Sequence, residues 1–177
     1  YDAERFPQVD GKWQFGVRTA KEGEVVSLLA EGGKDEDRDV ELKGTELLIV
    51  DESSDTLIGL AGVKGGRFAG VDEKTTQIII EAANFEPALT RTTARGLGIV
   101  IDASKRFENE PSRELPIYGQ AEIIKLITEI AGGESQGTID VYPEPEIRSK
   151  VSVRPEKVNA LLGLDLELAK MIEIVEL

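Results

Sequence analysis

Apolar and polar residues follow one another in short runs along the first third of the chain. Between Trp13 and Leu60 the runs "WQFGVRTA", "EVVSLLA", "DVELKG" and "ELLIVD" are separated by turns rich in Gly and Asp. A spacing of roughly ten residues between such runs predicts hairpins in a β-rich fold. The segment "GGKDEDRD" between two of them has no apolar residue, so we expect it to lie in solvent.

Further strands are predicted after residue 70. In "VDEKTTQIIIEAANF" a strand is expected over 76–82, and its three consecutive isoleucines suggest burial on both faces. In "IVIDASKRFEN" we expect a strand that ends near Asp102, then a turn into a short helix. "TIDVYPEPE" and "RSKVSVR" are also typical of strands, and the prolines between them mark a candidate domain boundary.

Other stretches have helical character. "EPALTRTTARGLG" predicts a short helix with Pro87 in its first turn and a stop at Gly96 or Gly98. The clearest helix is expected over 118–131, where apolar residues form one broad stripe and "GG" follows. Near the end, "RPEKVNALLGLDLELAKMIEIVEL" predicts two short helices joined at Gly163. The pattern therefore favours an α+β fold followed by a small helical module.

Composition narrows the chemistry that this chain can perform. Aromatic residues are only 5% of the 177, so the core should consist of Ile, Leu, Val and Ala. The longest apolar runs are far too short to span a membrane, and no signal segment opens the chain. The chain has no Cys and no His, which excludes disulfides, thiolate or imidazole metal ligands and acid–base catalysis by histidine. We expect a soluble protein with no metal site.

The net charge of −13 is opposite to that of a typical stand-alone nucleic-acid binder. Arg91, Arg95, Lys105 and Arg106 form a local basic concentration. They are either a solvated helix surface or the place where an anionic ligand lies. Nucleic-acid contact through this chain would depend on such a patch or on another chain.

The stretch "GLAGVKGGRFAGV" at residues 59–71 holds five glycines in thirteen positions. It lacks both common phosphate-loop motifs, which makes nucleotide binding an unfavourable interpretation. Glycine is more often required by a tight turn or by close approach of the backbone. A third interpretation is that a ligand occupies the space that a side chain would fill.

Glu81 follows the isoleucine run and shares a strand face with Gln77 and Ile79. It lies either at the exposed end of that strand or in the interior as an acceptor held for a partner. Burying a carboxylate is costly unless it is hydrogen-bonded. From the residues alone, a pocket is therefore expected near Gly65 and Glu81.

The run "GLAGVKGGRFAGVDEKTTQIIIEAANFEPALTRTTARGLGIVIDASKRFEN" resembles the β subunit of phenylalanyl-tRNA synthetase. That family carries A-G-V-M-G-G, then a strand ending L-E-A-A-x-F-x-P, then R-x-T-A-R-x-L-G-L-x-T-D-A-S-x-R-F-E-R-G. Upstream, "YDAERF" is similar to the family's H-A-[FY]-D segment. Downstream, "VRPEKVNALLGLDLELAKMIEIVEL" resembles the start of the module called B5. The resemblance implies a β-rich B3/B4 editing domain over 1–146, with a few packed helices and without its N-terminal part, and the start of B5 over 147–177.

This resemblance also implies an activity, the hydrolysis of mischarged Tyr-tRNA(Phe). An apolar synthetic pocket rejects an added hydroxyl by only about 10²-fold, so a second site must recognise it. By the family's motifs, Glu81 would accept a hydrogen bond from the tyrosine hydroxyl, and Gly65 and Ala103 would leave room for the ring. Ile101 replaces a threonine of this pocket. The family's editing histidine would precede Tyr1, so no catalytic residue is assigned within this chain.

The resemblance implies partners as well. The parent would be an α2β2 phenylalanine–tRNA ligase of the cytoplasm that uses ATP and Mg²⁺ and binds tRNA(Phe), while this fragment holds no cofactor. Arg91, Arg95, Lys105 and Arg106 are the candidate tRNA contacts. The alternative is a catalytically silent module that serves structure or tRNA docking, which the replacement at Ile101 favours. The isolated fragment is expected to edit weakly or not at all.

Overall fold

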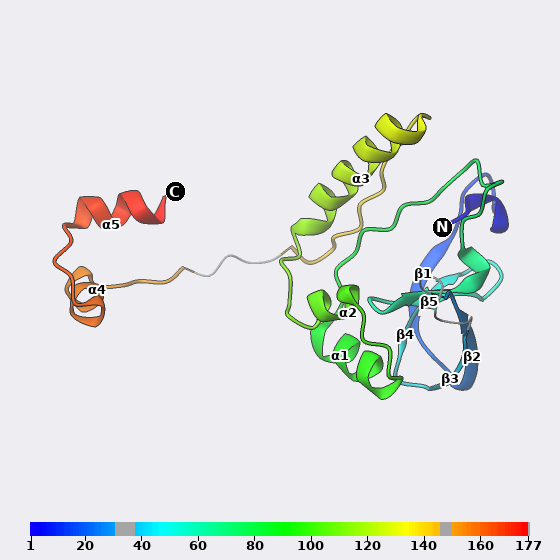
Figure 1. The fold of residues 1–177 in the computed structure, drawn as a ribbon, viewed down its shortest axis with the longest axis horizontal. Helices are drawn as coiled ribbons and strands as arrows, with labels where there is room; N and C mark the ends of the chain where they lie inside the picture. The colour runs from blue at the N-terminus through cyan, green and yellow to red at the C-terminus, as the bar shows by residue number, and fades with distance from the viewer. Residues whose placement is uncertain (31–37, 146–149, 177) are drawn as a thin grey trace. The chain divides into compact units, whose positions relative to one another are not determined.

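The computed structural model describes residues 1–30, 38–145 and 150–176. The chain divides into two compact units, Tyr1–Asp140 and Val141–Leu177 (Figure 1). Among the described residues, the strands all lie in the first unit, together with two short 3-10 helices and three α-helices. In chain order these elements are η1 (Ala3–Arg5), β1 (Phe15–Thr19), β2 (Glu22–Leu28), β3 (Arg38–Lys43), β4 (Leu47–Asp51), β5 (Thr56–Leu60), β6 (Lys64–Gly65), η2 (Arg67–Ala69), α1 (Pro87–Gly96), α2 (Asp102–Phe107) and α3 (Leu115–Ala131). Antiparallel sheets followed by helices confirm a mixed α+β fold.

The strands form two antiparallel sheets. One has the order β1-β4-β5-β6, and β2 pairs with β3 in the other. Phe15 pairs with Asp51 at one end of β1 and β4, and Leu48 pairs with Leu60 between β4 and β5. The predicted hairpins over residues 13–60 are therefore present. The segment "GGKDEDRD" falls mostly on residues 31–37, outside the described part of the chain.

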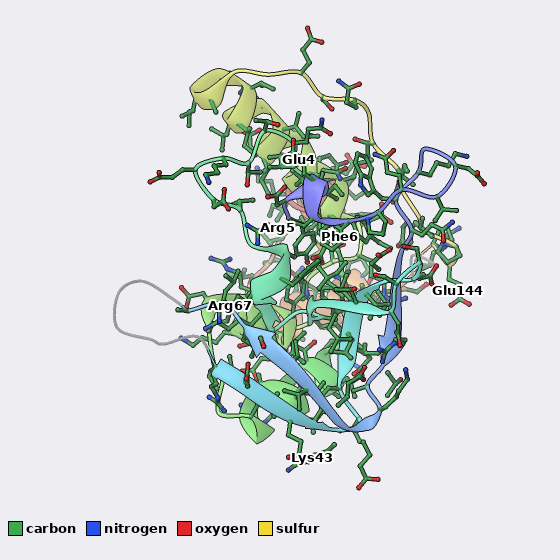
Figure 2. The ribbon with its side chains drawn as sticks, turned by 90° about the vertical axis from the view of Figure 1, so that its right-hand side faces the viewer. Glu4, Arg5, Phe6, Lys43, Arg67 and Glu144 are labelled. Carbon is green, nitrogen blue, oxygen red and sulfur yellow. The ribbon has the colours of Figure 1, made fainter. Side chains whose placement is uncertain are left out.

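The central strand β4 is covered on both faces, which explains its continuous apolar run. Leu48 and Val50 belong to a cluster that reaches the β2–β3 hairpin and helix α1. Ile49 points the other way, into a second cluster around Phe6 and Phe85. Alternating residues of one strand thus serve two separate cores. Figure 2 shows Phe6 in the interior below η1, whereas Lys43 projects outward at the end of β3.

Helix α1 begins and ends where its sequence predicts. Pro87 occupies the first turn, and the Glu86 carboxylate accepts from the Leu89 amide as the N-cap. After the helix, Gly98 has φ +67°, and the amide of Ile99 donates to the Ala94 carbonyl at 2.8 Å. This closure satisfies the last carbonyls of the helix.

Helix α3 is present, although it begins three residues before the predicted start at 118. Gly132 follows as its C-cap with φ +75°. No residue of α3 is fully buried. The apolar stripe is half-buried at Ile124 and Ile127 and exposed at Ile123 and Ile130.

Four predicted strands are absent from the described residues. Residues 76–82 are extended but pair only with residues 1–3, which are too few to make a strand, and Ile78 is 43% exposed. Residues 99–101 are used to end α1 and to begin α2 at Asp102. The segments 138–142 and 150–154 find no partner strand, and residues 148–149 lie outside the described part.

The second unit contains α4 (Pro155–Leu162) and α5 (Leu168–Val175). Gly163 ends α4 in the left-handed conformation, as the sequence predicts. The side chain of Asn159 holds the connection, because it donates to the Leu166 carbonyl and accepts from the Leu166 amide. The two short helices predicted on either side of Gly163 are confirmed.

Candidate functional site: a cavity around Glu81

A cavity of about 1190 Å³ lies in the first unit. Its walls come from the β5–β6 connection, the extended segment 81–85, helix α2 with the loop that follows it, and the first turns of α3. Small-molecule pockets commonly measure about 300 to 1,000 Å³, so the space is sufficient for an aminoacyl group. We call this space the Glu81 cavity.

The glycines of "GLAGVKGGRFAGV" serve different purposes. Gly62 has φ +69°, and a side chain on Gly66 would collide with the Ile58 carbonyl oxygen, so both are required by the turn. Gly65 has no such requirement. Of the residues that the structure describes, a Cβ added there would meet only Leu29, whose Cδ1 lies 3.7 Å away, an ordinary contact. Because Gly65 lines the Glu81 cavity, its missing side chain leaves open space in that cavity.

Glu81 is positioned by backbone pairing of the residues just before it, 77–79, with the N-terminal residues 1–3. The amide of Ile79 donates to the Tyr1 carbonyl at 2.9 Å, and the amide of Ala3 donates to the Gln77 carbonyl at 2.9 Å. Figure 1 shows this extended segment passing the N-terminus on its way from η2 to α1. Two residues after Ile79, Glu81 reaches the cavity wall.

The Tyr1 hydroxyl donates a hydrogen bond to Oε2 of Glu81, across 80 positions of sequence. Burial raises the pKa of the Glu81 carboxyl above its ordinary range, and the bond from Tyr1 acts in the opposite direction. Burial, together with the charge of Glu81, raises the pKa of the Tyr1 phenol far above its ordinary value. The phenol therefore keeps its proton as donor while the carboxylate accepts.

Neither alternative expected for Glu81 describes it in full. No strand forms here, so Glu81 is not a strand end; part of its surface is accessible to solvent through the open cavity, while the neighbouring atoms of the cavity wall desolvate the carboxyl. It is also an acceptor with a partner, since it holds the Tyr1 phenol. A carboxylate with this setting can recognise a ligand that presents a hydroxyl donor.

Helix α2 brings Ile101 and Ala103 to the cavity, where both are half-buried. Ile101 is the N-cap residue of α2 and has no side-chain atom to accept a hydrogen bond. Ser104, which is 1% exposed, supplies the reciprocal bond of a capping box, because its hydroxyl accepts from the Ile101 amide at 3.0 Å and donates to the Ile101 carbonyl at 2.9 Å. The neighbouring Asp102 side chain is 91% exposed. The cavity thus has an apolar wall at position 101.

The structure separates the four candidate basic residues into two pairs. Lys105 and Arg106 line the Glu81 cavity. Arg91 and Arg95 are exposed on α1 and do not line it, and Arg95 forms an ion pair of 3.5 Å with Glu108. Gly65, Glu81, Ile101 and Ala103 all line this one cavity, together with the first basic pair.

Several lining residues were not predicted from the sequence. Phe85 and Phe107 pack edge to face with 5.2 Å between ring centroids, and they join the extended segment to α2. The side chain of Asn84 donates to the Pro111 carbonyl at 2.8 Å. The sequence assigns Tyr1 no role beyond its place in "YDAERF". Only the spatial fold places its phenol on Glu81, and no local pattern signals that contact.

Within residues 1–30, 38–145 and 150–176, no three His, Cys, Asp or Glu side chains gather closely enough to hold a metal ion. No helix in these ranges has the length and apolar character needed to cross a membrane.

Residues 1–132 match the family described as the B3/4 domain. The chain is 42% identical over 126 residues to the phenylalanine–tRNA ligase β subunit of Porphyromonas gingivalis, which covers 71% of this chain and 15% of that protein. It is 40% identical over 152 residues to the protein of the same name in Dehalococcoides mccartyi, covering 85% and 18%. It is 36% identical over 166 residues to the corresponding protein of Rhodopirellula baltica, which covers 93% of this chain and 23% of that protein. The chain therefore spans less than a quarter of the length of these relatives.

Proposed function

Because the chain belongs to the B3/4 domain family, we propose that it is the editing domain of a phenylalanine–tRNA ligase β subunit and that it hydrolyses mischarged Tyr-tRNA(Phe). The observation that carries the proposal is the Glu81 carboxylate, which accepts a hydrogen bond from a phenol at the wall of a cavity. Tyrosine differs from phenylalanine only by a phenolic hydroxyl. The site thus presents the acceptor that this distinction requires.

The physical argument concerns the two aminoacyl groups. A tyrosyl group would donate its hydroxyl to Glu81, whereas a phenylalanyl group would leave the carboxylate without that donor. Once a bound ring excludes water from the cavity, a carboxylate oxygen left without a donor costs about 1 to 3 kcal/mol, and more because the group is charged. Gly65 and Ala103 would provide the space for the ring, and Lys105 and Arg106 lie where phosphates of the tRNA end would be attracted.

In the reaction, water attacks the ester carbonyl, the bond to the ribose oxygen breaks, and free tyrosine and tRNA(Phe) are released. The chain has no histidine, and we assign no general base to any of its residues. Its proposed contributions are binding, orientation and selection of the tyrosyl group. In the parent enzyme, charging of tRNA(Phe) with ATP and Mg²⁺ would belong to a complex with α subunits, two of each kind, in the cytoplasm.

A second candidate function is a catalytically silent docking module. The apolar Ile101 at the cavity wall favours it, since a polar group would be expected in a site that positions an ester and a water molecule. The exposed basic residues of α1 and α2 would then contact tRNA without hydrolysis.

The two candidates are distinguished by supplying the full-length synthetase with tyrosine, ATP and tRNA(Phe). Editing predicts that Tyr-tRNA(Phe) accumulates in Glu81→Ala and in Gly65→Trp but not in the wild type. Glu129→Ala is the matched control, since Glu129 is an exposed carboxylate of α3 that does not line the cavity. Equal accumulation in all four proteins would support the silent module and contradict editing.

A further inference from the structure

The contact between Tyr1 and Glu81 uses only part of the carboxylate. The phenol donates to Oε2. Among the described residues, Oε1 of Glu81 receives no hydrogen bond, and the side chain is open to solvent. An ionised carboxylate offers about four acceptor positions, so a second donor fits without displacing the first.

Tyr1 itself is held firmly. Its backbone pairs with Ile79 in both directions, by two hydrogen bonds of 2.9 Å. The next residue, Asp2, is 5% exposed, and its amide donates to the Ala69 carbonyl at 3.0 Å. The paired backbone holds Tyr1 in place, and its ring packs against the cluster around Phe6 and Phe85, so its hydroxyl is a positioned donor for the Glu81 carboxylate.

We propose that Tyr1 is a positioning residue that determines specificity: its phenol orients the Glu81 carboxylate and leaves Oε1 free to accept the hydroxyl of a tyrosyl group. This inference rests on the proposed editing function and extends it. It assigns Tyr1 no contact with the ester, and Tyr1 acts on the substrate only through Glu81.

The charge state of Glu81 supports this role. Burial raises the pKa of this carboxyl, and the phenol counteracts that effect by donating to the ionised form. The positive charge of the Tyr1 amino group also lowers the pKa of Glu81, and the other titratable side chains that line the cavity are Lys64, Asp102, Lys105 and Arg106. Without the phenol, the pKa of Glu81 rises further, and a larger share of the side chain is protonated. A protonated acid is a weaker acceptor for a tyrosyl hydroxyl.

A rival interpretation of the same contact makes the opposite prediction. If the tyrosyl hydroxyl took the position of the Tyr1 phenol on Glu81, Tyr1 would be an internal competitor. Its removal would then strengthen binding of the substrate. The sign of the change in KM for Tyr-tRNA(Phe) therefore separates the two interpretations.

The experiment compares Tyr1→Phe with the wild type in the full-length synthetase, by deacylation of Tyr-tRNA(Phe) between pH 6 and pH 8. Loss of an orienting bond to a charged group predicts that KM rises about tenfold while kcat stays within about twofold. The deficit should be larger at pH 6, where more Glu81 is protonated. Tyr118→Phe is the matched control, because this phenol is 71% exposed on α3 and outside the cavity lining. An unchanged KM or a lower KM in Tyr1→Phe overturns the inference.

A second arm keeps this result distinct from failure of the editing proposal. The synthetic site is filled with a non-hydrolysable phenylalanyl-adenylate analogue, and binding of free L-tyrosine and L-phenylalanine is measured by equilibrium dialysis. We expect the wild type to prefer tyrosine and Tyr1→Phe to lose most of that preference. If the wild type binds tyrosine selectively but does not deacylate, editing fails and the inference stands. The inference is overturned if the wild type shows no preference or if the variant retains it.

Discussion

Leu29 and Gly65 face each other across one wall of the Glu81 cavity. The Leu29 amide donates to the Gly65 carbonyl at 3.1 Å, and among the described residues only the side chain of Leu29 lies within 4 Å of the position where a Gly65 side chain would begin. The contact joins the end of β2 to β6. It fixes the backbone at Gly65 without requiring that the residue be glycine.

This relationship predicts different outcomes for two adjacent glycines. Gly65→Ala should change the free energy of unfolding by less than about 0.5 kcal/mol, because the added methyl group meets only Leu29. Gly66→Ala should cost about 1 to 3 kcal/mol, because its methyl group would be forced against the Ile58 carbonyl. Thermal or urea unfolding of both variants checks this. Equal losses would show that Gly65 is also required by the fold.

The raised pKa of Glu81 predicts an effect on stability with a definite sign. Since the pKa is higher in the folded than in the unfolded state, the folded state loses stability as pH rises through the interval between the two values. Glu81→Gln removes this titration. The melting temperature of the variant minus that of the wild type should therefore be larger at pH 7 than at pH 4. The same difference at both pH values would contradict the account.

Ile101 has two roles that a substitution can separate. As N-cap of α2 it lacks an acceptor, and a threonine hydroxyl there is worth about 0.5 to 2 kcal/mol. Its side chain also packs against the main core cluster, so Ile101→Thr loses part of that apolar contact. We expect the two effects nearly to cancel in thermal unfolding, within about 1 kcal/mol. Val100→Thr, at an exposed neighbouring position, is the control. A loss above that range would mean that packing outweighs the cap.

Glu24 should make the chain sensitive to acid. Its carboxylate binds the Arg18 guanidinium at 2.6 Å, and this bond holds the pKa of Glu24 below its ordinary range. Stability from the pair is present above the unfolded pKa and is lost as pH falls through the folded value. Glu24→Gln should therefore cost about 1 kcal/mol at pH 7, and this cost should shrink progressively as pH falls below the ordinary pKa of a glutamate. Glu22→Gln, exposed on the same strand, should show no such convergence.

Local sequence patterns predicted those parts of the fold that depend on local chemistry. The hairpins of residues 13–60 followed from alternation with Gly- and Asp-rich turns. The start of helix α1 was predicted from Pro87, and the end of α4 before α5 was predicted from Gly163. Each of these features is decided by backbone preference within a few residues.

The strand expected over 76–82 was wrong for a physical reason. Consecutive isoleucines indicate apolar character, but a strand also requires a partner, and the structure supplies only residues 1–3. The same limit applies to the contact of Tyr1 with Glu81, which joins residues 80 positions apart. The candidate residues themselves came from motif order and identity, and the fold placed Gly65, Glu81, Ile101 and Ala103 around one cavity.

The central claim is that Glu81 selects the tyrosyl hydroxyl. Its most direct test is the ratio of kcat/KM for deacylation of Tyr-tRNA(Phe) to that of Phe-tRNA(Phe), measured for the full-length synthetase and for Glu81→Ala. We predict a ratio well above one in the wild type that falls by at least about tenfold in the variant. An unchanged ratio would contradict the account.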